Sequence, residues 1–257
     1  VLVLDILEQQ GRVWKIRSAP VFSADGKVET VVNFGFDVTS LVNARNTRGR
    51  GDELICPSIT YWASALQAFS LGATVVFADI HPDTLCIDPA DIEHRITDRT
   101  KAIMVVHYCG HPADMDVILP IARRHGLKVI EDNSHAHGTL YKGRPTGALG
   151  DVAAMSMMAG KSFAIGEAGM LDTDDGELFE RAVAFAHYQR HSTQLTRPEL
   201  TARAGLPLGG VKGRMNQTCA AMGRVQLRAY PRRMAEIQSA LSRFWDALEP
   251  TPGLRAH

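Results

Sequence analysis

Residues 129–137 read VIEDNSHAH and residues 147–169 read GALGDVAAMSMMAGKSFAIGEAG. In the first stretch an apolar run delivers the carboxylate of Asp132 to the end of a predicted strand. In the second stretch Lys161 lies among small residues and glycines. A lysine amine can hold a cofactor aldehyde as a Schiff base, and a carboxylate can keep a pyridine nitrogen protonated. The two stretches therefore favour pyridoxal phosphate chemistry, provided that the fold brings both side chains together.

The composition indicates an ordinary soluble protein. The chain has 257 residues, of which 45% are hydrophobic and 22% charged, and it can bury a sizeable core. Lys+Arg and Asp+Glu are both 28, so nothing in the charge balance indicates nucleic acid or an anionic membrane as a partner. No apolar run reaches the about 18 residues that cross a bilayer. The four cysteines are Cys56, Cys86, Cys109 and Cys219, and they form no CxxC pair. This spacing fits a reducing cytoplasm.

The first fifty residues differ in pattern from the rest. Residues 12–22 and 28–36 are rich in β-forming residues and flank the turn dipeptide Asp25-Gly26, which predicts a β-hairpin. Residues 37–40 supply N-cap candidates for a short helix. The polar, glycine-bearing segment 45–51 then marks a domain boundary.

From residue 51 onward strands and helices alternate. The pattern predicts strands at 54–57, 74–79, 101–107, 128–132 and 169–173, and helices at 61–71, 89–96, 114–125, 175–187, 215–227 and from Pro231, with a long loop at 189–210. Such alternation argues for an α/β fold with three layers, a mainly parallel sheet covered by helices on both faces. Ligands gather at the carboxyl ends of such strands, which is where Asp132 is expected.

Each candidate residue also has an ordinary structural interpretation. Most lysines are solvated surface charges, and Asp132 could cap the helix that follows its strand. Ser156 and the neighbouring glycines favour a ligand site around Lys161, because glycine lets the backbone approach a ligand closely. His135 could face a cofactor or bond a backbone carbonyl, and we expect His137 to be structural.

The histidines allow a different hypothesis, a divalent metal site. An H-x-x-x-H and an H-x-H pattern occur near two carboxylates, in the set His107, His111, Asp114, Asp116, His135 and His137. Pro112 would break a helix between the first two histidines, which makes a shared helical face doubtful. We therefore expect no metal, and keep a metal-dependent enzyme using His107, His111 and His135 as an alternative.

With these motifs in place, residues 51 to about 254 resemble the DegT/StrS family of sugar aminotransferases, which are fold-type-I pyridoxal phosphate enzymes. The shared markers are GDELICPSIT (51–60), LGA (71–73), DIHPDTL (79–85), ITDRTKAI (96–103), HYCGHPADMD (107–116), ED (131–132), AHG (136–138), YKG (141–143), GE (166–167) and RM (214–215).

The resemblance implies a role for each site residue. Lys161 would form the Schiff base with pyridoxal phosphate and later carry a proton, while Asp132 would pair with the pyridine nitrogen. The cofactor ring would meet His135 and Tyr61, and its phosphate would meet Ser156. The resemblance also implies amino transfer from a donor such as glutamate to a keto sugar, typically nucleotide-linked, by a homodimer.

Three departures from the family pattern matter. The family has a phosphate-binding turn before residue 51, and this sequence does not match it. Residues 12–44 instead resemble the closing hairpin of a PAS sensor domain. Thr39-Ser40 could be a degenerate form of the phosphate-binding turn. Lys212 stands where the family has an asparagine that reaches the partner's cofactor, and it could still contact phosphate. Most of the small C-terminal domain is expected to be missing.

These departures set the expected domain division and the alternatives. The expected domains are an atypical hairpin segment at 1–50, a cofactor-binding large domain at 51–230 and the start of a truncated domain at 231–257. A regulatory or sensor protein built on a degenerate aminotransferase domain is one alternative. A relative that performs dehydration is another, although such dehydratases replace the lysine that is retained here as Lys161.

Overall fold

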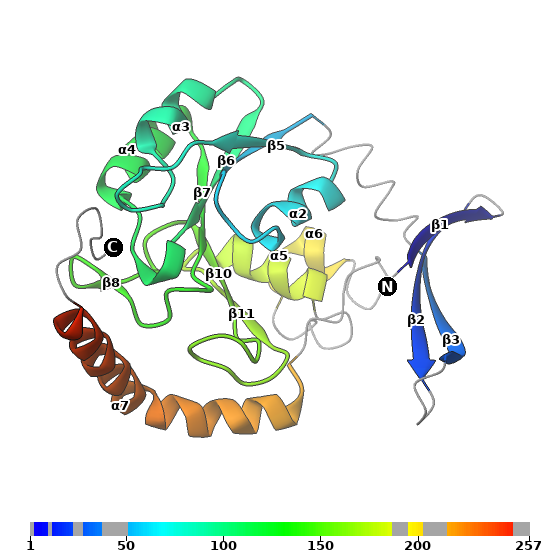
Figure 1. Cartoon of the computed structure of the whole chain (residues 1–257). Coiled ribbons are helices and arrows are strands. Elements are labelled where there is room, and N and C mark those ends of the chain that lie inside the picture. Colours follow the sequence, from blue (N-terminus) through cyan, green and yellow to red (C-terminus); the bar gives the residue numbers. More distant parts are fainter. Residues whose placement is uncertain are drawn as a thin grey trace. The chain divides into compact units, whose positions relative to one another are not determined.

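The computed structural model describes residues 3–9, 12–22, 28–37, 51–186, 195–202 and 215–248 (Figure 1). The chain divides into two compact units. The first consists of Val1–Gly51, Phe69–Ala73 and Glu180–Lys212, and the second of Asp52–Ala68, Thr74–Phe179 and Gly213–His257.

The first unit contains a three-stranded antiparallel sheet. Its strands are β1 (Val3–Gln9), β2 (Arg12–Phe22) and β3 (Val28–Asp37), in the order β1-β2-β3. The predicted hairpin of β2 and β3 is confirmed, with Ile16 opposite Gly35 in the register. Strand β1 was not predicted, because its sequence VLDILEQ lacks the alternation of apolar and polar residues that marks a strand. The helix expected after residue 37 lies outside the described residues.

The second unit is built on a six-stranded sheet with the order β11-β10-β7-β6-β4-β5. Five strands run parallel, and β11 pairs antiparallel with β10, so the sheet is mainly parallel as expected. The bounds are β4 (Glu53–Pro57), β5 (Thr74–Ala78), β6 (Thr100–Val106), β7 (Lys128–Asp132), β10 (Val152–Ser156) and β11 (Gly169–Asp172). The central strand β7 ends at Asp132.

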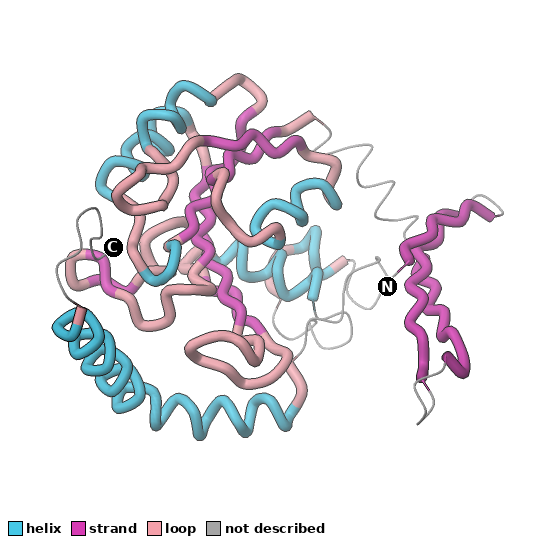
Figure 2. Tube along the Cα trace, in the orientation of Figure 1, coloured by secondary structure: helices cyan, strands magenta, loops and turns pink. Residues whose placement is uncertain are grey.

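Helices lie on both faces of this sheet, as Figure 2 shows. On one face α3 (Pro89–Arg95) and α4 (Met115–His125) cover the strands, and on the other lies α2 (Ala63–Ser70). The core packs between the sheet, α3 and α4, and includes Ile55, Ile92, Ile103, Val105, Met115, Ile118 and Val129. The ends of these helices follow the predicted signals, since Asp88 accepts a hydrogen bond from the Ala90 amide and Gly126 caps α4 with φ 64°.

Two β elements between α4 and β11 were not predicted. A short hairpin joins β8 (Leu140–Tyr141) to β9 (Arg144–Pro145), and β10 follows it. The sequence of β10, VAAMS, is short and contains two alanines, so it lacks the β-branched and aromatic residues that mark most strands. Its place in the sheet therefore depends on pairing with β7. A 3₁₀ turn, η1 (Tyr108–Gly110), follows β6.

The last helices are α5 (Gly176–Ala186), α6 (Pro198–Thr201) and α7 (Gln217–Ala247). The expectation of a second helix starting at Pro231 is wrong, because α7 is one helix of 31 residues with Pro231 inside it. A proline removes one backbone hydrogen bond and bends a helix, and a well-supported helix can continue through it; Figure 1 shows α7 bending along its length. Among the described residues, no helix has both the length and the apolar character of a membrane span.

Candidate active site

The carboxyl ends of three strands meet at one cavity of about 700 Å³. Val106 ends β6, Asp132 ends β7 and Ser156 ends β10, and all three line the cavity. Lys161, Tyr61 and His135 line it too. The structure therefore brings together five of the residues predicted from the sequence, although they lie up to a hundred positions apart (61 to 161). The sixth, Lys212, lies outside the described residues.

Asp132 is held on the α2 side of the sheet by two hydrogen bonds. Ser64, in the first turn of α2, donates from its Oγ to Oδ2 of Asp132 at 2.7 Å. The backbone amide of Ser134 donates to the other oxygen, Oδ1, at 3.0 Å. Each carboxylate oxygen can accept more than one hydrogen bond, so this carboxylate is fixed in place and still able to accept a third donor from the cavity.

Lys161 follows β10 on a tight segment. Its backbone amide donates to the carbonyl of Met158 at 2.9 Å, so the residues between them form a turn. Its side chain is half-buried, and within the described part of the chain its Nζ forms no ion pair or hydrogen bond. An amine that lines a cavity without a carboxylate partner is available to react with a bound group.

His135 and Tyr61 supply flat side chains to the cavity. The His135 ring lies edge-on to Tyr108, with ring centroids 5.9 Å apart. Partial burial lowers the pKa of His135 and the Lys161 ammonium lowers it further, while Asp132 opposes the shift. The imidazole is therefore neutral at neutral pH. Tyr61 is 60% exposed, and its ring lies beside that of Trp62, with ring centroids 5.0 Å apart.

His137 contacts one residue before and one residue after Lys161 in the sequence. Its Nε2–H donates to the carbonyl of Ser156 at 2.9 Å, and its Nδ1 lies 3.1 Å from the Oγ of Ser162. Tyr230, from α7, donates its hydroxyl to the His137 carbonyl at 2.9 Å. Burial is the main cause of the lowered pKa of His137, and the carbonyl of Ser156 opposes it. The expectation that His137 is structural agrees with these contacts.

The histidines of the metal hypothesis are separated by their other contacts. His107 is fully buried, with Nε2 2.9 Å from Glu131 and Nδ1 3.1 Å from the Ala113 amide. His135 instead lines the cavity described above. Nowhere in the described ranges do three or more His, Cys, Asp or Glu side chains converge as metal ligands. The alternative of a metal-dependent enzyme therefore gains no support here.

Sequence reasoning missed the residues that support the site. Ser64 contacts Asp132 directly and lies 2.8 Å from the Oγ1 of Thr60, and Ser134 contacts it through the backbone. Ser134 also accepts a hydrogen bond from the Ser156 amide at 2.9 Å, which joins the ends of β7 and β10. One sequence signal could have indicated Ser64: it is a small hydroxyl residue in the first turn of the helix after β4, and the start of that helix lies near the carboxyl ends of the strands.

One protein family matches most of the chain. The DegT/DnrJ/EryC1/StrS aminotransferase family matches residues 39–257. Spore coat polysaccharide biosynthesis protein SpsC of Bacillus subtilis (strain 168) is 38% identical over 208 residues, 80% of this chain and 54% of SpsC. The dTDP-3-amino-3,4,6-trideoxy-alpha-D-glucose transaminase of Streptomyces venezuelae is 44% identical over 158 residues, 61% of this chain and 42% of the transaminase.

A solved structure has the same fold. A putative sugar aminotransferase from Streptococcus pneumoniae, in its PMP-form, superposes with a TM-score of 0.66 and 27% sequence identity, covering 80% of this chain and 56% of that one. The three-layer architecture is thus that of the pyridoxal phosphate aminotransferases, and the expected fold class is confirmed.

The chain belongs to the DegT/DnrJ/EryC1/StrS aminotransferase family, whose members depend on pyridoxal phosphate. The resemblance inferred from the sequence motifs is confirmed. The chain spans about half the length of the curated relatives it matches.

Proposed function

We propose that this chain forms the cofactor-binding part of a pyridoxal phosphate dependent aminotransferase. The enzyme moves an amino group from an amino acid, which we expect to be glutamate, to the keto group of a sugar, which we expect to be nucleotide-linked. One observation carries the proposal: Asp132 and Lys161 line the same cavity, although 29 positions (132 to 161) separate them. The Streptomyces venezuelae relative, named as a transaminase of a dTDP-linked sugar, supports the acceptor class.

The cavity residues fit pyridoxal phosphate by their chemistry. The cofactor needs a fixed acceptor for its pyridine N–H, an amine for its aldehyde and donors for its phosphate. Asp132 is fixed by Ser64 and Ser134 and retains acceptor capacity, and Lys161 presents an unpaired amine within the described residues. A cavity of about 700 Å³ is within the usual size of a cofactor site.

Each residue has a distinct task in this proposal. Pyridoxal phosphate, when bound, withdraws electrons from the carbon that carries the migrating amino group. Asp132 would accept a hydrogen bond from the pyridine N–H and so keep the proton on that nitrogen. Lys161 would hold the cofactor aldehyde through Nζ, and its amine could also move a proton at the α-carbon of the donor.

The remaining residues bind and orient. His135 and Tyr61 line the cavity, where the neutral His135 ring would face the cofactor without adding a positive charge and Tyr61 would stack on the pyridine ring. Ser156 would donate its hydroxyl to the phosphate. Lys212 would provide a further cation for a phosphate group, in the position where the resembled family has an asparagine.

We also infer a homodimer in the cytoplasm. A homodimer is the assembly that the family resemblance implies. The cytoplasm agrees with the four free thiols at Cys56, Cys86, Cys109 and Cys219. A single sedimentation experiment on the purified chain distinguishes a dimer from a monomer.

Lys161 is tested by trapping the bound cofactor. We expect the purified chain with added pyridoxal phosphate to absorb in the near-visible range, and borohydride to fix the cofactor on the peptide that contains Lys161. Lys161→Ala abolishes both signals, whereas Lys142→Ala preserves them, because Lys142 pairs with Asp116 outside this cavity. Fixation on another lysine, or a signal that survives Lys161→Ala, refutes the assignment.

A further inference from the structure

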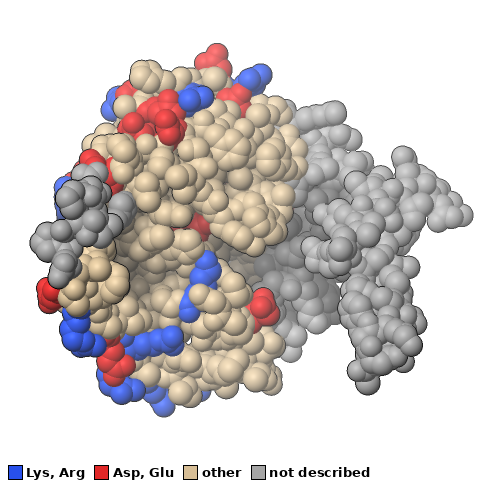
Figure 3. All heavy atoms as spheres, in the orientation of Figure 1, with Lys and Arg blue, Asp and Glu red and all other residues tan. Residues whose placement is uncertain are grey.

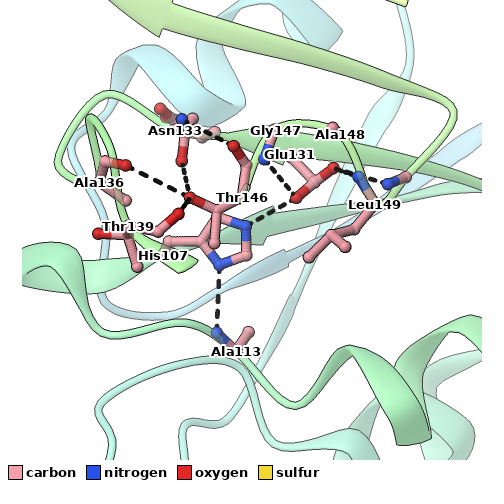
Figure 4. A network of polar contacts seen from close by, with 12 residues as sticks. His107, Ala113, Glu131, Asn133, Ala136, Thr139, Thr146, Gly147, Ala148 and Leu149 are labelled. Atoms are coloured by element: carbon pink, nitrogen blue, oxygen red, sulfur yellow. Dashed lines mark hydrogen bonds and ion pairs between the residues drawn. The ribbon is translucent and has the colours of Figure 1, made fainter. Parts of the chain in front are cut away.

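Glu131, the residue before Asp132, is a carboxylate buried inside the molecule with 0% exposure. Its side chain accepts four hydrogen bonds, which Figure 4 shows converging on it. The Nε2 of His107 and the amide of Gly147 bind Oε2 at 2.9 and 2.8 Å. The amides of Leu149 and Gly150 bind Oε1 at 2.8 and 2.6 Å. None of these contacts belongs to the chemistry proposed above.

The hydrogen bonds show that Glu131 is an anion and His107 is neutral. Because Nδ1 of His107 accepts the Ala113 amide at 3.1 Å, the ring proton lies on Nε2 and is donated to Glu131. Burial alone would raise the pKa of Glu131, but the donors from His107 and the loop amides outweigh it, so its pKa is lowered. The negative charge is stabilised chiefly by backbone amides of a single segment.

That segment, residues 146–151, is the anchor loop that connects β9 to β10. It is attached to β7 along its length. Thr146 donates to Oδ1 of Asn133 at 2.7 Å, and the Asp151 amide donates to the carbonyl of Val129 at 2.9 Å. A Cβ at Gly150 would lie 2.9 Å from the Val129 carbonyl, so no larger residue fits this approach. Glu131 and Asn133, on either side of Asp132, both bind the anchor loop.

Two consequences follow for the cavity. Side chains alternate along a strand, so binding Glu131 and Asn133 on one face directs Asp132 to the other face, toward α2. The anchor loop also leads directly into β10 and sets its register, with Ala154 opposite Asp132. That register decides where Ser156 and then Lys161 lie relative to Asp132.

We propose that Glu131 is a positioning residue that sets the separation between Asp132 and Lys161, by binding the anchor loop and thereby the register of β10 on β7. The inference rests on the proposed function, because the positioning role concerns Asp132 and Lys161, the two groups that would hold the cofactor. Its structural content, the contribution of one buried carboxylate to holding residues 147–161 on β7, can be tested without the cofactor.

The test compares Glu131→Gln with a matched variant, Glu53→Gln. Glu53 is also a buried carboxylate of the same sheet, with hydrogen bonds from Thr97 and Arg99, but it lies at the opposite, amino end of β4. In Glu131→Gln the new amide points N–H groups at the N–H donors of the loop. We expect amide hydrogen exchange in residues 147–161 to accelerate about tenfold or more in Glu131→Gln and to stay unchanged in Glu53→Gln.

A second pair of variants covers the case in which Glu131→Gln does not fold. Gly150→Ala pushes the anchor loop away from β7 while the Glu131 carboxylate is retained, and it should accelerate exchange in the same segment. Gly176→Ala is its control, because a Cβ at that glycine meets nothing within 4 Å. Unchanged exchange at residues 147–161 in Glu131→Gln, or in Gly150→Ala when the first variant is insoluble, overturns the proposal.

The cofactor supplies the functional readout. With added pyridoxal phosphate, we expect borohydride fixation on Lys161 to slow about tenfold or more in Glu131→Gln relative to Glu53→Gln, because a misplaced reacting group loses rate steeply. Equal fixation rates in these two variants overturn the positioning role. If the unaltered chain shows no fixation on Lys161, the proposed function fails, while the exchange comparison still decides whether Glu131 holds the loop.

Discussion

Glu131 and Asp132 are adjacent carboxylates with opposite surroundings. Strand geometry turns their side chains to opposite faces of β7, and the burial of each then follows from what packs on that face. Glu131 faces the anchor loop and is enclosed by four donors, whereas Asp132 faces α2 and the cavity with two donors. Side-chain direction, rather than residue type, separates a structural carboxylate from a cofactor-binding one.

Asp132→Asn tests the role of the charge in the cavity. An amide cannot stabilise a protonated pyridine nitrogen, so we expect amino transfer from glutamate to the cofactor to fall by roughly 10²-fold or more. The measurement is single-turnover absorbance of the bound cofactor. Asp116→Asn is the control, because that exposed carboxylate pairs with Lys142 outside the cavity. An equal loss in both variants would contradict the assignment.

Glu131 also predicts the pH dependence of stability. Its folded-state pKa lies below the usual value of 4.5, so its stabilising contribution is present above that pH and is lost as pH falls through the folded pKa. We expect the free energy of unfolding in urea to decline from about pH 5 downward, and Glu131→Gln to make that decline shallower. At neutral pH the substitution should cost on the order of 3 kcal/mol, since it leaves buried donors without an acceptor.

A residual decline in Glu131→Gln is expected from other carboxylates. Hydrogen bonds from Thr97 and from Arg124 lower the pKa values of Glu53 and Glu93, respectively, and both carboxylates remain in the variant. Identical slopes in the two proteins would show that Glu131 does not titrate with a lowered pKa in the folded state.

At the scale of elements, most helices and strands follow local signals. Asp88 with Pro89 starts α3, and Gly126 ends α4, as the sequence indicates. The exceptions are β10, whose alanine-rich sequence has weak strand preference, and α7, which continues through Pro231. Long-range contacts decide both: β10 pairs with β7 and β11, and Tyr230 of α7 binds the His137 carbonyl.

Gly126→Ala tests the cap of α4. This glycine has φ 64°, a left-handed conformation that costs a residue with a Cβ about 1 kcal/mol, while a Cβ there meets nothing within 4 Å. We expect the midpoint of urea unfolding to fall accordingly with an unchanged slope. Gly176→Ala, at the first position of α5 without a positive φ, should not destabilise the protein. Equal midpoints for the two variants would contradict the strain argument.

At the scale of the whole molecule, charge and surface composition agree with a small-molecule enzyme. The formal net charge is zero, and Figure 3 shows both acidic and basic side chains on this face of the described residues, with basic ones gathered along its lower edge. The first compact unit extends beyond residues 1–50 to include Phe69–Ala73 and Glu180–Lys212, and the family match begins at residue 39. The complete division at 1–50, 51–230 and 231–257 stays a prediction, as does the likeness of residues 12–44 to a PAS hairpin.

Cofactor binding should stabilise the whole folded chain. A ligand that binds only the folded state raises its stability in proportion to the logarithm of its concentration, by about 2.7 kcal/mol at a hundredfold excess over Kd. We expect pyridoxal phosphate to raise the unfolding temperature, and pyridoxal without the phosphate to raise it less. The check is thermal unfolding followed by circular dichroism at several cofactor concentrations. An unfolding temperature that stays the same at all cofactor concentrations would mean that the described cavity does not bind the cofactor.

The sequence by itself determined the alternation of elements, the family and the identity of the candidate residues. Apolar periodicity, caps and short motifs are local, so a single chain displays them without a structure. Only the tertiary structure decided that Asp132 and Lys161 share a cavity, that Ser64 supports Asp132, and that His107 contacts Glu131. These facts depend on which strands pair and which face each side chain takes, and strand pairing between distant segments leaves no local mark in the sequence.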